Sequence, residues 1–151
     1  MPDLLVNLLK LPAIESTDAF VLRRAQPFEL SAVHQFVATN FSTAWADEVS
    51  VGFAHQPISV YVATIERELV GFSAYECTRR GFFGPTGVTQ SAQGKGIGKA
   101  LLLASLWGLR EMGYVYAIIG AAGPVRFYQK TVGAIIIPDS EPGIYTDMLK
   151  R

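Results

Sequence analysis

The sequence predicts a mixed α/β fold in which a mostly antiparallel central sheet is flanked by helices. Two observations predict this class. Residues 58–77 hold two runs rich in β-branched residues, separated by a charged turn at 66–68, which is typical of a hairpin. Residues 81–120 then read as a strand, a glycine-rich turn, a long helix and a strand, which adds a helix-linked pair of strands to the sheet.

The length of 151 residues suits a single domain, 1–151, that can bury a hydrophobic core. Half of the residues are apolar and 17% are charged, which excludes a disordered chain. The formal net charge is zero, so the basic excess of a nucleic-acid-binding domain is absent. The single cysteine, Cys77, excludes an internal disulfide and a cysteine-based metal site, and no metal is expected.

No apolar run reaches the roughly 18 residues that a membrane span needs. The first ten residues are apolar but contain an acid and have no basic region ahead of them, unlike a signal peptide. We therefore expect a soluble cytoplasmic protein without a membrane or nucleic-acid partner.

The N-terminal third predicts one or two strands and two helices. Residues 4–11 fit a strand or a short helix, and as a strand they can pair across a homodimer or cover their own sheet. Residues 19–25 read as a strand. Pro27 suits the first turn of a helix that runs to about residue 41, with Leu30, Val33 and Val37 on one apolar stripe. Ser42 can cap a second helix.

The C-terminal half predicts further strands around one long helix. Residues 96–112 form that helix, closed by Gly113. Residues 114–120 are β-branched and aromatic with few charges, which favours a strand buried on both faces. A short helix at 124–131 and two last strands, at 134–137 and 144–149, complete the chain.

Residues 81–88 leave two interpretations open. Gly84, Pro85 and Gly87 weaken a regular ladder, since proline has no N–H to donate. The segment is therefore either a loop that becomes a strand only near Gly87, or a bulged strand that separates from its neighbour and leaves backbone groups free for a ligand.

The glycine-rich turn at 93–98 lies between a short extended segment and a strong helix former, which is the arrangement of an anion site. The first N–H groups of a helix lack internal partners, and the helix dipole favours negative charge there. The ATP/GTP loop G-x-x-x-x-G-K-[ST] is excluded because Ala100 follows Gly98 and Lys99 where a hydroxyl is needed. The dinucleotide pattern G-x-G-x-x-G fails from either Gly94 or Gly96.

The spacing that does fit is Q/R-x-x-G-x-G/A, met by Gln93, Gly96 and Gly98, with Val88 five residues before Gln93. Downstream, residues 127–134 read Phe-Tyr-Gln-Lys-Thr-Val-Gly-Ala, like an F-Y-E-K-x-G-F ending with one extra residue before the glycine. Together these motifs resemble the GCN5-related N-acetyltransferase (GNAT) family. The resemblance is close over 72–134 and extends elsewhere only in the order of elements.

This resemblance implies the GNAT fold with splayed fourth and fifth strands, and acetyl-CoA as co-substrate. Tyr128 falls where the family has its general acid, although it can equally pack its ring in the core. The backbone N–H near Val88 is expected to stabilise the oxyanion. The residues implied to bind acetyl-CoA are Thr86, Gly87, Val88, Gln93, Gly94, Lys95, Gly96, Ile97, Gly98 and Lys99.

The general base is less well defined. Some family members have a glutamate twelve residues before the tyrosine and many have an asparagine seven before it; here these positions are Tyr116 and Ala121. The favoured candidate is Glu76, a carboxylate at a strand end near the expected cleft. The others are Asp47 and Glu48, which read more readily as a solvated helix face, and the two histidines His34 and His55.

The function predicted is N-acetyl transfer to a primary amine of a small molecule or a peptide by direct attack. The alternative is a module of the same fold that binds acyl-CoA without turnover. A nucleotide-binding domain of another kind is disfavoured by the loop spacing.

Overall fold

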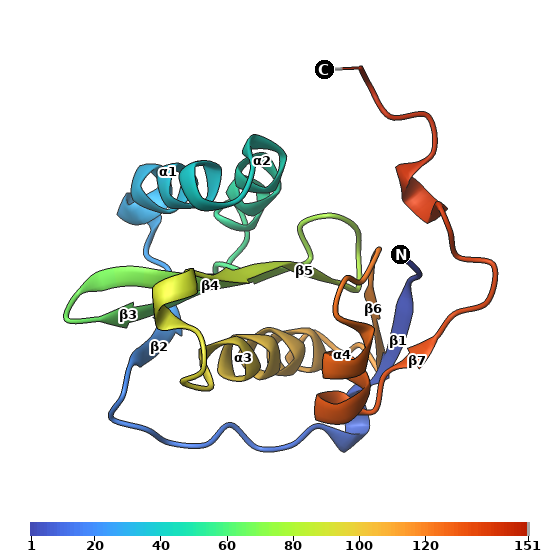
Figure 1. Ribbon diagram of the computed structural model, residues 1–151, viewed down its shortest axis with the longest axis horizontal. Coiled ribbons are helices and arrows are strands. Elements are labelled where there is room, and N and C mark those ends of the chain that lie inside the picture. The colour runs from blue at the N-terminus through green and yellow to red at the C-terminus, as the bar shows by residue number, and fades with distance from the viewer. Residues whose placement is uncertain (151) are drawn as a thin grey trace.

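The computed structural model describes residues 1–150 and shows a seven-stranded open sheet in the order β2-β3-β4-β5-β6-β1-β7. Helices α1 and α2 cover one face of the sheet, and α3 and α4 lie against the other (Figure 1). The strands are β1 (Leu4–Asn7), β2 (Val21–Arg24), β3 (Val60–Ile65), β4 (Glu68–Tyr75), β5 (Phe82–Val88), β6 (Tyr116–Ile119) and β7 (Ile135–Ile136). The helices are α1 (Leu30–Asn40), α2 (Thr43–Gly52), α3 (Ile97–Glu111) and α4 (Val125–Val132).

The sheet is mixed and mostly antiparallel, as predicted. Only β5 and β6 run parallel, and they pair at just two positions, Phe82 with Ile118 and Phe83 with Ile119. Beyond Phe83 the two strands separate while β5 continues to Val88. The pairing of β4 with β5 also shifts register between Ser73 and Tyr75. The bulged, splayed strand is therefore the correct interpretation of residues 81–88.

The N-terminal strand β1 lies inside the sheet, between β6 and β7. Leu4 and Val6 are completely buried in the core cluster that also contains Leu102 and Leu106 of α3. Both interpretations of residues 4–11 hold in part, because β1 is followed by a 3-10 turn at Leu8–Lys10.

The prediction of a last strand at 144–149 is wrong. The first two of these residues belong to a short 3-10 turn, Gly143–Tyr145, the others form no strand, and Leu149 is 92% exposed. The edge beside β6, where a terminal strand could pair, is already occupied by β1, and β7 pairs with β1 over only two residues. The tail after β7 therefore runs on as an irregular segment above the sheet (Figure 1).

The prediction that the strand at 114–120 is buried on both faces is also wrong. Ala117 and Ile119 are buried, but Tyr116 is 55% exposed. The reason is that α1 and α2 lie over the β2 to β5 part of the sheet and leave this part of the same face uncovered (Figure 1).

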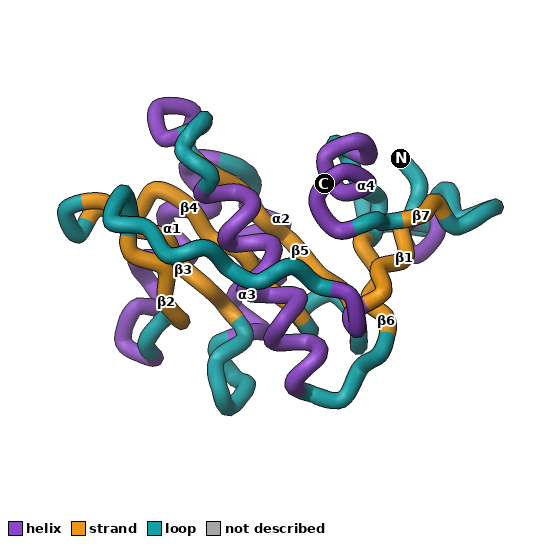
Figure 2. Tube along the Cα trace, turned by 90° about the horizontal axis from the view of Figure 1, so that it is seen from below, coloured by secondary structure: helices purple, strands orange, loops and turns teal. Residues whose placement is uncertain are grey.

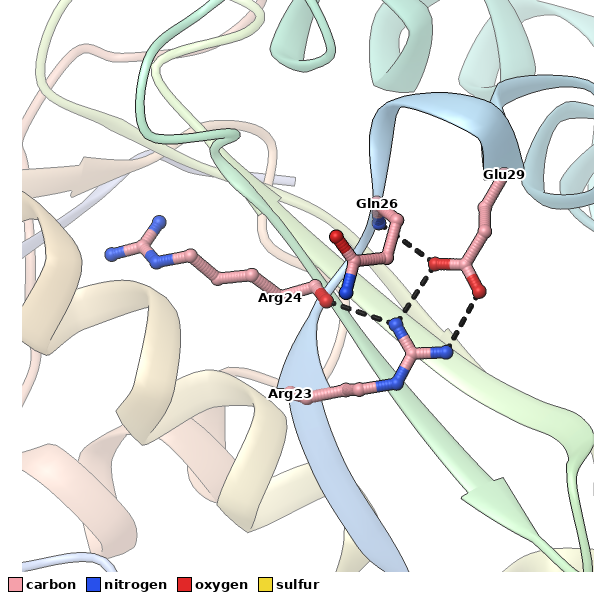
Figure 3. A network of polar contacts seen from close by, with 4 residues as sticks. All are labelled: Arg23, Arg24, Gln26 and Glu29. Atoms are coloured by element: carbon pink, nitrogen blue, oxygen red, sulfur yellow. Dashed lines mark hydrogen bonds and ion pairs between the residues drawn. The ribbon is translucent and has the colours of Figure 1, made fainter.

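A polar network fixes the angle at which α1 leaves β2 (Figure 3). The Arg23 guanidinium donates to both Glu29 carboxylate oxygens, at 2.8 and 2.7 Å, and the Gln26 N–H donates to Glu29 at 2.7 Å. The hydrogen bond from Arg23 lowers the pKa of Glu29. Such bidentate pairs are directional, so the network holds the α1 and α2 layer at a defined place over the sheet.

Helix α2 begins as predicted, with the Ser42 side chain accepting a hydrogen bond from the Trp45 N–H at 3.1 Å. Val33 and Val37 of α1 and Val49 of α2 are buried against the sheet, whereas Leu30 of the predicted stripe is partly exposed. On the opposite face, the segment between β1 and β2 crosses the outer side of α3 (Figure 2), and Trp107 donates to the Pro12 carbonyl at 2.9 Å.

Candidate functional site

The glycine-rich loop ends at Gly96, the N-cap of α3, which has a φ of 80°. Gly94 has a φ of 84°. These left-handed conformations favour glycine, and a Cβ built at either position meets no atom within 4 Å. The loop surface is therefore open on the side to which these positions point.

The backbone N–H groups of this loop are free donors. In the part of the chain that the structure describes, none of the N–H groups of residues 94–99 donates a hydrogen bond, and the helical ladder starts with Ala100 donating to Gly96. Consecutive unpaired N–H groups at a helix N-terminus attract an anion such as a phosphate. The loop thus has the donors that the predicted pyrophosphate site requires.

The side chains of the loop are placed around this site. Gln93 Nε2 donates to the Val88 carbonyl at 3.4 Å, which ties the loop to the end of β5. Lys95 and Lys99 are exposed and border a smaller cavity of about 230 Å³, together with Glu15 and Thr17 from the segment below α3.

A larger cavity of about 990 Å³ runs along β5 and is lined by helices from both faces of the sheet. Trp45 and Glu48 of α2 line it from one face, and Leu102 of α3 and Tyr128 of α4 from the other. Since these helices lie on opposite sides of the sheet (Figure 1), the cavity crosses the sheet where β5 and β6 separate.

The free edge of β5 offers backbone groups to this opening. Thr89 N–H donates to the Val70 carbonyl at 2.8 Å, and bonded pairs alternate in an antiparallel ladder. Gly87, paired with Phe72, therefore bonds to β4, whereas the N–H and C=O groups of Thr86 and Val88 point toward the opening. The contact from Gln93 to the Val88 carbonyl agrees with this direction.

Tyr128 packs its ring in the core and also lines the large cavity. Its side chain is only 6% exposed, and its ring packs edge-on against Phe83 with the centroids 6.3 Å apart. Within residues 1–150, Thr89 Oγ1 is the one fully buried side-chain polar atom without a partner. The Tyr128 hydroxyl has no hydrogen-bond partner either, but it is not among the fully buried atoms. It is therefore partly accessible, on the side where Tyr128 lines the large cavity. Burial raises the pKa of Tyr128 to about 12, so the phenol is protonated at neutral pH.

Glu76 does not line the large cavity, although Thr78, two residues further on, does. Its Oε2 accepts the Gly81 N–H at 2.7 Å and its Oε1 accepts the Tyr114 hydroxyl at 2.8 Å. Glu76 lines neither cavity, because these contacts turn the carboxylate toward the loop between β4 and β5. Its role as a base stays a prediction.

The histidines are also placed outside the large cavity. His34 lies 3.5 Å from the Asp47 carboxylate on the exposed side of α1 and α2. His55 Nδ1 lies 3.0 Å from the hydroxyl of Ser59, which is buried.

Glu48 is the cavity residue whose place the sequence did not predict. It is half-buried, lines the large cavity and accepts a hydrogen bond from the Thr78 hydroxyl. The signal in the sequence was its spacing from Ser42 and Trp45, at i+6 and i+3, which places the three residues along one side of the helix. All three line the cavity.

Within residues 1–150, no group of three or more His, Cys, Asp or Glu side chains is arranged to hold a metal ion. In the same part of the chain, no helix combines the length and apolarity required to cross a bilayer.

Two parallel strands that separate within a mixed sheet, with an anion-binding loop beside the opening, are typical of the fold of acetyltransferases that use acyl-CoA. The family described as "acetyltransferase (GNAT) domain" matches residues 56–131, half of the chain. The chain belongs to the GCN5-related N-acetyltransferase family, as its motifs predicted. A comparison with curated proteins found no match.

Several solved structures share this fold. The glucosamine N-acetyltransferase region of a fungal multi-domain β-N-acetylglucosaminidase is 15% identical, with a TM-score of 0.71 over 90% of this chain and 19% of that one. A GCN5-related N-acetyltransferase from Sphaerobacter thermophilus is 18% identical, with a TM-score of 0.67 over 90% of this chain and 48% of that one. A GNAT acetyltransferase from Brucella melitensis, solved with acetyl-CoA, is 20% identical, with a TM-score of 0.58 over 74% of this chain and 80% of that one. The chain therefore spans less than half the length of the first two.

Proposed function

We propose that the protein transfers an acetyl group from acetyl-CoA to a primary amine of a small molecule or a peptide. The observation that carries this proposal is the run of unpaired N–H groups at 94–99, placed beside a cavity that crosses the sheet. Membership of the GNAT family supports it, as does the presence of acetyl-CoA in the Brucella melitensis neighbour.

The site is suited to an elongated donor. The N–H groups of 94–99 would bind the pyrophosphate, with Lys95 and Lys99 beside it. From there the free N–H and C=O groups of Thr86 offer partners for the pantetheine amides. This direction would bring the thioester to the place where β5 and β6 separate, close to the wall that Tyr128 forms.

The chemistry requires an acceptor that enters from the other face. A neutral amine attacks the acetyl carbonyl carbon, and the carbonyl oxygen gains negative charge, which the Val88 N–H would stabilise. The nitrogen then loses a proton, the carbon–sulfur bond breaks, and the CoA thiolate takes up one proton. The products are the N-acetylated amine and free CoA.

Tyr128 is the proposed acid for the departing thiolate. A thiol has a pKa of about 8.5, well below the value of about 12 to which burial raises that of Tyr128. Complete proton transfer from the phenol to the sulfur is therefore uphill. A hydrogen bond to the sulfur, which strengthens as the negative charge develops, is the contribution that this tyrosine can make.

The test is release of free thiol from acetyl-CoA in the presence of a panel of primary amines. Thiol release that depends on an added amine, with the acetylated amine detected by mass spectrometry, is the expected result. Binding of CoA without thiol release for any amine would favour the alternative, a module that holds acyl-CoA without turnover.

A further inference from the structure

The end of the large cavity on the α2 side carries an unusual charge pattern. Among its lining residues in the described chain, only Glu48 and Glu141 have charged side chains, and both are acidic. Glu141 is 56% exposed and already forms an ion pair with the Met1 amino group. Glu48 is half-buried and forms no ion pair within residues 1–150.

The Glu48 carboxylate is also only partly hydrogen-bonded. Thr78 donates to Oε2, whereas Oε1 has no hydrogen-bond partner among the described residues. Glu76 differs, since both of its oxygens accept hydrogen bonds. A half-buried carboxylate that lacks a cationic partner leaves a favourable place for one, because desolvated charges are stabilised by an opposite charge.

The surroundings of Glu48 in the cavity are apolar and aromatic. Trp45 lies one helical turn away on α2, and Phe82, Tyr145 and Met148 form other walls. The pKa of Tyr145 is raised by burial and by the negative charge of Glu48, which places the C-terminal segment within electrostatic reach of this carboxylate. No lysine or arginine side chain of the described residues lines the cavity, and the Met1 amino group, which does border it, is already paired with Glu141. A carboxylate on the ligand would therefore find no unpaired cation among the lining residues.

We propose that this end of the cavity binds a primary amine that has an apolar, aromatic-sized body and no acidic group, with Glu48 receiving its ammonium group. The inference rests on the proposed function for the statement that the bound amine is the acetyl acceptor; the bound ammonium group then gives one proton to water, and the neutral nitrogen attacks. Its location follows from the fold: the unpaired N–H groups that suit the donor lie at the N-terminus of α3, on the opposite face of the sheet from α2 (Figure 1).

The test compares three ligands of similar size and different charge: 2-phenylethylamine, 2-phenylethanol and 3-phenylpropanoate. Their affinities are measured by calorimetry on the protein saturated with CoA, so that no turnover takes place. We expect the amine to bind at least tenfold more tightly than the alcohol, and the carboxylate to bind least. Glu48→Gln should abolish the preference for the amine and leave the affinity for the alcohol unchanged.

The matched control is Asp47→Asn, on the adjacent residue of the same helix. Asp47 is exposed and lies outside the cavity, so its variant should keep the full preference for the amine. Glu48→Asp should keep a preference because the charge remains. Equal affinity of wild type for amine and alcohol, no detectable binding of the amine, or an unchanged preference in Glu48→Gln would each overturn the proposal. Since CoA replaces acetyl-CoA, a failure of acetyl transfer is recorded separately, in the thiol-release assay.

Discussion

The Tyr114 hydroxyl donates a hydrogen bond to Glu76 Oε1 at 2.8 Å, from the segment before β6 to the end of β4. The other carboxylate oxygen accepts the Gly81 N–H at 2.7 Å. Glu76 therefore braces the loop that leads into β5, the strand along which the large cavity runs. This geometry favours a structural role for the residue that the sequence favoured as a base.

Glu76→Gln should consequently lower stability and leave turnover nearly unchanged. The glutamine side chain has one oxygen that can accept a hydrogen bond, and its NH2 group cannot accept the other. The expected loss in the free energy of unfolding is about 1–2 kcal/mol, and the midpoint of thermal unfolding should fall by roughly 2–8 °C. Tyr114→Phe removes one of the same hydrogen bonds and should show about half of the effect. A loss of more than tenfold in kcat at an unchanged midpoint would instead restore Glu76 as the base.

Gly96→Val should abolish CoA binding, because it adds a side chain to the loop whose unpaired N–H groups at 94–99 are proposed to bind the pyrophosphate. The positive φ of 80° also makes any side chain costly, by at least about 1–2 kcal/mol. CoA should therefore raise the unfolding midpoint of wild type by mass action and not that of the variant.

Gly113→Val is the matched control for this backbone strain. Gly113 lies just past the other end of α3, has a φ of 102° and likewise has no atom within 4 Å of a built Cβ. Both variants should lose similar stability, but only Gly113→Val should respond to CoA. Equal CoA responses of the two variants would contradict the assignment of the loop.

Tyr128→Phe should lower kcat at least tenfold while the affinity for CoA changes little. The ring contact with Phe83 is kept, and the lost hydroxyl has no hydrogen-bond partner within the described chain. Removing a mostly buried hydroxyl that has no partner is neutral or stabilising, so the unfolding midpoint should stay level or rise. Unchanged turnover would remove Tyr128 from the mechanism, and a fall in the midpoint would show that the hydroxyl has a structural role.

The sequence predicted those features that short spacings determine. The loop 93–98 and the cap at Ser42 both depend on residues within a few positions of one another. For residues 81–88 the local sequence left a loop and a bulged strand open, and the resemblance to the family implied the separated strands that the structure has. The prediction of a strand at 144–149 was wrong for a different reason. Its local propensity was suitable, but the edge of β6 was taken by residues 4–7, and such competition between distant segments leaves no local pattern.

The site shows the same division between local and distant information. The N–H groups at 94–99 followed from the helix start, whereas the roles of Glu48 and Glu76 depended on which side chain packed toward the opening. Thr78, from the loop after β4, approaches Glu48, and Tyr114 turns Glu76 away. Neither partner lies close to its glutamate in sequence, so the assignment needed the packed structure.

Leu4→Ala should destabilise the protein strongly, because β1 is an internal strand. Leu4 is completely buried and pairs with both Ile119 and Ile136. Truncating a buried leucine costs about 2–5 kcal/mol. Leu9→Ala, at a leucine that is 57% exposed in the turn after the strand, should cost less than about 0.5 kcal/mol. Chemical denaturation measures both, and equal losses would contradict the placement of β1 inside the sheet.

Cys77 should resist alkylation at moderately alkaline pH. Burial raises the pKa of its thiol from 9.0 to about 11, with the charge of Glu48 adding to the effect against a hydrogen bond from Ser59. Only the thiolate reacts, so at pH 8 iodoacetamide should modify the native protein about a hundredfold more slowly than the unfolded chain. The thiol has a higher pKa in the folded protein than in the unfolded chain, so it favours the folded state below pH 9. This contribution to stability is lost as the pH rises toward 11. The native alkylation rate should therefore keep rising roughly tenfold per pH unit beyond pH 9, and a plateau there would show that the thiol is solvated.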